Sequence, residues 1–301
     1  MSNNSNYYYL NKNKIYDFIS CKDQFIFLKN LFFIYILIVF SFYLYSQFSH
    51  LIVFFIIIGL LQYLLVQALH EAWHYHKGKS FFETILVTNI LSFLLFIPLT
   101  ARKIHFHHHK NLGDSINDPD YVKAPETIKQ LIFQSIFYLS GVDAIKRYFK
   151  LNNISDLSKE RFYEKIINNL NIALVQILFF VNLNFFFNIL IVDYIILWVF
   201  PLITIVNFLN KIRLIAEHGI GYGPCNLKSF SKNSLINRFL GAFGFLNHAE
   251  HHVYPNLRYY SLSKIKKDFN DLYLNDTSVV KIEYVNNNYF SYLISSLKKN
   301  N

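Results

Sequence analysis

Two long apolar runs constrain the fold of this chain most strongly. Residues 31–69 contain no Lys, Arg, Asp or Glu, and in residues 171–210 the only charged side chain is Asp193. Each run is about 40 residues long, which is roughly 60 Å as an α-helix and about twice the hydrocarbon thickness of a bilayer. The sequence therefore predicts two hairpins, each with two membrane-spanning helices.

The four predicted spans cover about residues 31–45, 51–69, 172–190 and 194–210. Two further apolar stretches are predicted to lie at the membrane surface or to pack against the spans. Residues 81–100 contain polar side chains and have basic residues at both ends, and residues 131–142 are too few to cross a bilayer. We therefore predict an all-α integral membrane protein with four transmembrane helices in two hairpins, interfacial helices and a cytoplasmic histidine-rich cap.

The polar segments carry the basic residues. The formal net charge is +10, but Lys and Arg are spread over all segments outside the apolar runs. This distribution follows the positive-inside rule and lacks a basic patch, so no nucleic-acid partner is expected. The predicted organisation is a cytoplasmic N-terminal tail at 1–30, a membrane domain at 31–264 and a cytoplasmic C-terminal tail at 265–301. The two cysteines, Cys21 and Cys225, exclude a disulfide framework and a Cys-rich zinc site.

Ten of the twelve histidines lie in three short segments: HEAWHYH at 70–76, HFHHH at 105–109 and HAEHH at 248–252. Residues at i, i+3 and i+4 share one face of a helix, so each segment presents a convergent set of imidazoles. Two hairpins that start on the inner side bring all three segments to one membrane face, and His218 follows the fourth span by about two turns. The candidate metal ligands are His70, His74, His105, His108, His109, His218, His248, His251 and His252.

Three histidine clusters exceed the needs of one tetrahedral zinc, although HEAWH alone matches the zinc-peptidase pattern. Imidazole-rich sites suit iron, and nine histidines would give each of two ions about four or five ligands. The sequence thus predicts a di-iron centre that activates oxygen. His107 lies at i+2 from His105 and is predicted to point away from the metals. His50 and His76 are expected to be bystanders.

Six carboxylates lie near the candidate ligands in the sequence: Glu71, Glu217, Glu250, Asp114, Asp118 and Asp120. Neighbouring side chains diverge on a helix, which makes direct metal ligation the less favoured role. Hydrogen bonding to the ligand imidazoles and simple surface exposure both remain open.

The three histidine segments resemble the histidine boxes of the membrane fatty-acid desaturase and hydroxylase superfamily, whose spacing is HX3-4H, HX2-3HH and HX2-3HH. The similarity runs from about Leu31 to Lys264 and includes LGDSINDPD after the second box and VYPNLRYYSL after the third. RLIAEHG resembles the extra-histidine segment of bacterial-type members, including the rhizobitoxine desaturase-like group. Leu214 departs from some acyl-CoA desaturases, which have an Asn one turn before the extra histidine, so no water-bridging ligand is expected there.

This resemblance implies two iron ions, O2 as co-substrate and an acyl chain of a lipid or acyl thioester as substrate. No HPGG-type cytochrome b5 segment is present, so the electron donor is expected to be a separate protein of the ferredoxin or cytochrome b5 type. Desaturation is the leading prediction, and a hydroxylase or ketolase on the same scaffold is the nearest alternative. An intramembrane zinc peptidase would leave two clusters unused. A membrane metal-binding or transport protein would be expected to carry ligands within its spans.

Overall fold

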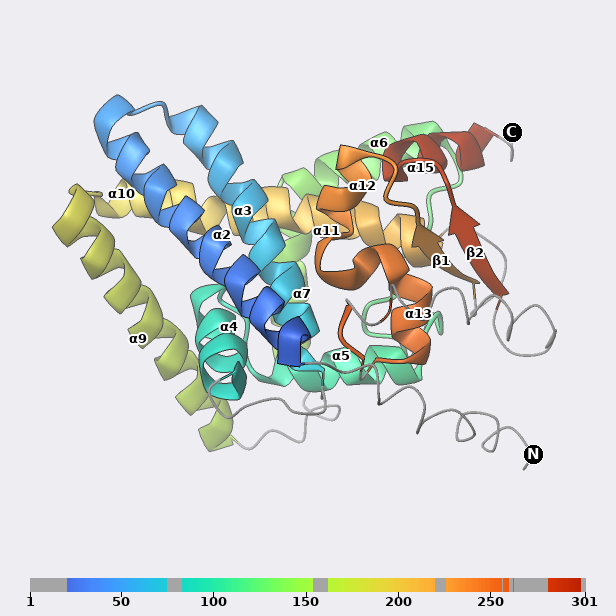
Figure 1. Cartoon of the computed structure of the whole chain (residues 1–301), viewed down its shortest axis with the longest axis horizontal. Helices are drawn as coiled ribbons and strands as arrows, with labels where there is room; N and C mark the ends of the chain where they lie inside the picture. The colour runs from blue at the N-terminus through green and yellow to red at the C-terminus, as the bar shows by residue number, and fades with distance from the viewer. Residues whose placement is uncertain are drawn as a thin grey trace.

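Four long apolar helices form the part of the protein that can cross a membrane (Figure 1). The first hairpin consists of α2 (Cys21–Phe48) and α3 (Leu51–Trp73), and α9 (Phe162–Phe187) begins the second. The fourth span is built from α10 (Ile191–Tyr194), η2 (Ile195–Val199), η3 (Leu202–Val206), α11 (Asn207–Leu214) and η4 (Ile215–Gly219). The predicted all-α membrane class with four spans is confirmed.

This structure is a computed structural model that describes residues 21–74, 83–153, 162–219, 226–255, 257–259, 262 and 281–298. The predictions for residues 1–20, His76 and Cys225 lie outside these residues. Where spans are described, they are longer than predicted: α2 covers Cys21–Phe48, whereas residues 31–45 were expected. Hydropathy marks only the part of a helix that lies among acyl chains, while the hydrogen-bonded backbone continues beyond it.

The turn within each hairpin follows a helix that ends with a residue in the left-handed region. Ser49 after α2 has φ 54° and Asn188 after α9 has φ 56°. Their backbone N–H groups donate to the carbonyl oxygens of Tyr45 and Asn184, each at 2.8 Å, which terminates the helices as left-handed C-caps do. The Tyr45 hydroxyl also donates to Asp193 Oδ1 at 2.7 Å, so the end of α2 is joined to the start of the fourth span.

The first hairpin packs closely against the fourth span. A Cβ atom at Gly59 would lie 2.8 Å from Ile205 Cδ1 and 3.1 Å from Pro201 Cβ, so the missing side chain allows the close approach. Gln62 Nε2 donates to the carbonyl oxygen of the fully buried Trp198 at 2.8 Å. These contacts hold the middle of α3 against the middle of the fourth span.

The stretch predicted at 81–100 forms two short helical segments, η1 (Glu83–Ile90) and α4 (Leu91–Leu94). The chain then turns at Phe96, which has φ 56°, and enters α5 (Thr100–Lys110). Gln176 on α9 donates to two carbonyl oxygens at the end of α4, at 2.7 and 2.8 Å. Among the described residues this stretch forms no span, in agreement with the prediction.

Two amphipathic helices follow, α6 (Ile128–Leu139) and α7 (Val142–Asn153), and both contact the fourth span. The stretch expected at 131–142 therefore belongs to packed helices. Lys211 Nζ on α11 lies 3.4 Å from Asp143 Oδ2 on α7, and both side chains are largely buried. This ion pair connects α7 to the part of the fourth span that precedes His218.

The C-terminal part of the chain consists of β1 (Asn226–Phe230), α12 (Leu235–Leu240), η5 (Ala242–Asn247), α13 (His248–Val253), β2 (Lys281–Val285) and α15 (Tyr289–Lys298). β1 and β2 pair in parallel, with Asn226 opposite Lys281. The segment expected as a C-terminal tail at 265–301 contains β2 and α15, and α15 buries Tyr289, Leu293 and Leu297. A ten-residue helix with one apolar face is too short to be detected as a span, so hydropathy does not identify it.

Candidate metal centre

Four elements from distant parts of the sequence carry the candidate ligands, and they meet near the ends of α3 and the fourth span. Figure 1 shows α5 and α13 near the end of α3. His70 lies in the last turn of α3 and His74 directly follows that helix. α5 carries the histidines of the second segment, η4 carries His218, and α13 carries those of the third segment. Because α3 and the fourth span return to the same side, all nine candidate ligands meet in one place.

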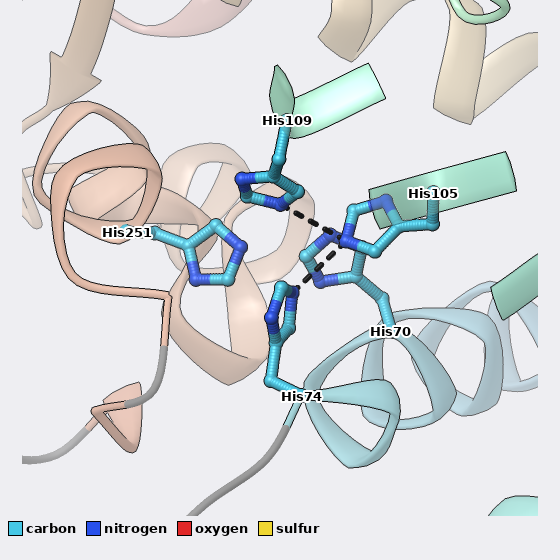
Figure 2. A group of neighbouring side chains, drawn as sticks. All are labelled: His70, His74, His105, His109 and His251. Atoms are coloured by element: carbon cyan, nitrogen blue, oxygen red, sulfur yellow. Dashed lines mark hydrogen bonds between the residues drawn. The ribbon is translucent and has the colours of Figure 1, made fainter. Parts of the chain in front are cut away.

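The first group contains five histidines whose ligand nitrogens all lie within 4.8 Å of one another: His70, His74, His105, His109 and His251. Figure 2 shows these rings converging from α3, α5 and α13. His105 Nε2 lies at the centre, 2.9 Å from His74 Nε2 and 3.0 Å from His109 Nε2. This group can hold one metal ion.

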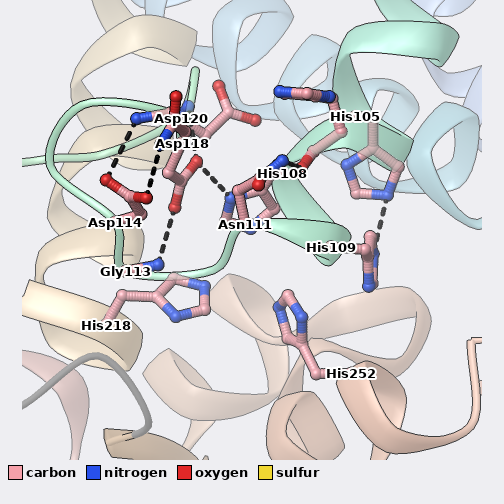
Figure 3. A network of polar contacts seen from close by, with 12 residues as sticks. His105, His108, His109, Asn111, Gly113, Asp114, Asp118, Asp120, His218 and His252 are labelled. Atoms are coloured by element: carbon pink, nitrogen blue, oxygen red, sulfur yellow. Dashed lines mark hydrogen bonds and ion pairs between the residues drawn. The ribbon is translucent and has the colours of Figure 1, made fainter.

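The other four candidate ligands fall in two overlapping groups of neighbouring ligand atoms: His108 with His218 and His252, and His218 with His248 and Glu217. The four histidines of these two groups are called the second group. His248 Nε2 lies 2.6 Å from His218 Nε2 and 3.0 Å from His252 Nε2. His108 completes the group, with its ring centroid 5.3 Å from those of His218 and His252 (Figure 3). The two groups adjoin, because the ring centroids of His109 and His252 are 4.3 Å apart.

The nitrogen separations fit chelation of a common ion. Two nitrogens that each bond to one metal at about 2.1 Å, with an angle of 90° between the bonds, lie about 3.0 Å apart. A ring nitrogen carries either one proton or one lone pair, so it cannot fully satisfy two separate hydrogen bonds. His105 Nε2 and His248 Nε2 nevertheless each have two imidazole nitrogens within 3.0 Å. A metal ion bound by each set of three nitrogens would satisfy all three of them together.

Burial keeps the imidazoles neutral, which is the form that binds metal. It is the largest cause that lowers the pKa of His105, His248 and His252 well below the usual value, and neighbouring imidazoles lower it further. Burial and the nearby His108 lower the pKa of His109 to about 3. These four rings are therefore ready to accept cations at neutral pH without first losing protons.

The buried Asp118 orients one ligand of the second group. Its Oδ1 lies 2.7 Å from His108 Nδ1, which leaves Nε2 of that ring for a metal. Asp118 also accepts hydrogen bonds from the backbone N–H groups of Gly113 at 2.9 Å and Asp120 at 2.8 Å (Figure 3). A carboxylate held by the backbone in this way fixes the ring that it contacts.

Surface exposure is excluded for Glu71, Glu217, Glu250 and Asp118, which are all buried. The predicted contact with a ligand imidazole is found for Asp118, and Glu217 lies beside His248. Glu71 Oε1 accepts from the Tyr259 N–H at 3.2 Å, and Glu250 Oε2 accepts from Ser229 Oγ at 2.5 Å. The remaining two carboxylates have other partners. Asp114 accepts backbone N–H groups of its own loop, and Asp120 pairs with Arg147.

The bystander histidines differ in position from the nine. His50 is exposed in the turn between α2 and α3, at the opposite end of α3 from His70. His107 is half-buried and belongs to neither group of neighbouring ligands among the described residues.

Two buried residues near the second group were not anticipated from the sequence, Arg213 and Tyr289. The sequence signal for Arg213 was its position four residues before Glu217, which places the two side chains on one face of a helix.

Comparison with known proteins agrees with this geometry. A family model described as fatty acid desaturase matches residues 46–278, which is more than half of the chain. We found no significant match among curated proteins or among solved structures. The matched region contains all nine histidines and ends before β2 and α15.

Proposed function

Because the chain belongs to the fatty acid desaturase family, we propose that it is an O2-dependent desaturase that introduces a double bond into an acyl chain of a lipid or acyl thioester. The observation that carries this proposal is the pair of adjoining groups of five and four histidines at the ends of four apolar helices. The family and the apolar spans support an integral membrane oxidoreductase. The position of the double bond and the identity of the acyl carrier are separate questions of substrate.

The nine histidines are proposed to hold two irons, five nitrogens at the first group and four at the second. An unactivated methylene has neither an acidic proton nor a leaving group, and a di-iron centre supplied with O2 and electrons provides an oxidant strong enough to remove its hydrogens. The protein contributes the fixed ligand geometry. Asp118 orients His108, and the burial of His105, His108 and His248 keeps bulk water from the ligands.

The acyl chain is proposed to approach from the membrane, since the spans end at the histidine groups. Electrons are proposed to come from a separate donor protein of the ferredoxin or cytochrome b5 type. RLIAEHG, which contains His218, supports the assignment to bacterial-type members, including the rhizobitoxine desaturase-like group. A hydroxylase or ketolase would use the same ligands and differ in its product. A zinc peptidase would use two histidines of HEAWH and leave seven of the nine without a role.

Lipid profiling by mass spectrometry tests the reaction directly. Cells that express the protein should contain acyl chains lighter by two hydrogens than those of cells with an inactive ligand variant. A gain of one oxygen would instead identify a hydroxylase or a ketolase. An unchanged acyl profile under iron-replete, aerobic conditions would contradict the proposed function.

The purified protein is expected to hold about two metal ions per chain, and these should be iron in the active form, because imidazole-rich sites with more than four ligands suit iron better than zinc. Elemental analysis after iron-replete expression measures this number. A single zinc per chain would argue against the proposed centre.

The active site and both termini are proposed to face the cytoplasm. Residues 46–50 and 188–193 of the outer turns contain no Lys or Arg, whereas basic residues flank the histidine segments. His50→Cys and Ser115→Cys, both at exposed positions, should therefore react with an impermeant thiol reagent from opposite sides. A chain with Cys21 and Cys225 replaced by Ser serves as the background. Equal labelling of both positions from outside would contradict this topology.

A further inference from the structure

We propose that Tyr289, on the C-terminal helix α15, is a positioning residue for the second histidine group. This inference rests on the proposed function, because it assumes that each histidine group holds a metal ion. It makes β2 and α15 part of the metal centre, although they lie beyond the residues that the family model matches.

A continuous path of buried contacts leads from α15 to a ligand. The Tyr289 hydroxyl donates to Glu217 Oε1 at 2.9 Å. Glu217 Oε2 accepts from Arg213 Nη1 at 2.6 Å and lies 3.4 Å from His248 Nδ1. All four residues are at most 5% exposed. Tyr289 therefore reaches a ligand of the second group through one carboxylate.

Both oxygens of Glu217 are occupied, so this carboxylate is suited to orienting a ligand. His248 turns Nε2 toward His218 and His252, and its Nδ1 lies 3.4 Å from Glu217 Oε2, within ion-pair distance and without a hydrogen bond. A carboxylate behind a ligating imidazole fixes its tautomer and its ring orientation. Without the Tyr289 hydroxyl, Glu217 Oε1 would lose the donor that holds it, and only Arg213 would determine the orientation of the carboxylate.

The C-terminal segment holds the Tyr289 ring firmly. The ring stacks on Phe230 of β1, with centroids 3.8 Å apart and an angle of 16° between the planes. The Tyr289 N–H donates to Asn237 Oδ1 at 3.1 Å. β2 pairs with β1, so Val285, four residues before Tyr289, lies opposite Phe230. The ring is thereby fixed from the backbone and from one face.

Strand β1 also supports the third histidine segment, residues 248–252. Ser229 on β1 accepts from the Ala249 N–H at 3.0 Å and donates to Glu250 at 2.5 Å. β1 thus contacts α13, which carries His248, on one side, while β2 and α15 hold it on the other. The C-terminal segment therefore supports the second group by two routes, through Glu217 and through β1.

Tyr289→Phe tests the first route, because it removes one hydroxyl and keeps the ring that stacks on Phe230. Tyr292→Phe is the matched control, since Tyr292 lies on the same helix and its hydroxyl donates to Glu283 of β2 at 3.3 Å. The metal-free, full-length protein is titrated with Co²⁺, and visible absorbance follows the two equivalents separately. We expect Tyr289→Phe to weaken the Co²⁺ affinity of the second histidine group by roughly 10-fold to 100-fold. The Co²⁺ affinity of the first group should stay unchanged. Tyr292→Phe should match the unmodified protein at both.

Glu217→Gln provides a second variant on the same path and should weaken the Co²⁺ affinity of the same group. The melting temperature of each metal-free variant separates positioning from folding. Equal binding by Tyr289→Phe and Tyr292→Phe would overturn the proposal. A uniform weakening of both equivalents together with a lower melting temperature would also overturn it, because a merely structural role predicts that result. If the unmodified protein binds fewer than two ions, the proposed di-metal centre fails first and this inference falls with it.

Discussion

His108→Ala is expected to abolish product formation and to lower the metal content of the purified protein, whereas His107→Ala should keep measurable turnover. His108 is 4% exposed, belongs to the second group and is held by Asp118, so its loss leaves a metal under-coordinated. His107 lies two residues from His105, a rotation of roughly 200° on a helix, and is in neither group. Its loss removes at most a supporting contact, which costs roughly 10-fold to 100-fold.

Iron content and acyl products of the purified variants measure this contrast. His218→Ala and His252→Ala should behave like His108→Ala, because both rings belong to the same group. His107→Ala is the matched control, since it removes a neighbouring imidazole from the same helix. A metal-free His107→Ala variant alongside an active His108→Ala variant would show that the helical phase of α5 has been assigned wrongly.

The sequence predicts the nine histidines but not how they divide between two ions. Helical spacing tells which side chains share a face of their own helix, and the division depends on how separate helices meet. On α5, His105 and His109 belong to the first group and His108 to the second. On α13, the roles are exchanged: His248 and His252 belong to the second group and His251 to the first. Each of these helices supplies an i, i+4 pair to one group and a single histidine to the other.

The number of spans was predictable because a helix that crosses a bilayer needs a minimum length of uncharged, apolar sequence. No comparable constraint acts on the C-terminal segment. α15 buries Tyr289, Leu293 and Leu297 on one face, yet it is ten residues long and follows a strand that contains Lys281 and Glu283. This strand, β2, pairs with β1, which lies more than 50 residues earlier in the chain. A parallel pairing between two short, polar strands leaves no pattern that a single sequence would reveal.

Arg213→Met is expected to lower the free energy of unfolding of the metal-free protein by about 3–5 kcal/mol. The side chains of Arg213 and Glu217 are 7% and 0% exposed, and their contact is 2.6 Å long. Arg213 also lies over the Phe245 ring, 3.6 Å from its centroid. Methionine retains part of this packing but leaves the Glu217 carboxylate buried without its cationic partner. Thermal and denaturant unfolding of the purified protein in detergent measure the loss.

Lys123→Met is the control, because Lys123 and Glu126 form a solvent-exposed pair 3.9 Å apart with side chains 79% and 71% exposed. Removing one charge from such a pair should change the free energy of unfolding by at most about 1 kcal/mol. The double variant Arg213→Met/Glu217→Gln should recover much of the loss, since it removes both charges of the buried pair. If Arg213→Met were no more destabilising than Lys123→Met, the pair would contribute little to folding. If the double variant were no more stable than Arg213→Met, the loss would come from packing against Phe245 rather than from an unpaired buried charge.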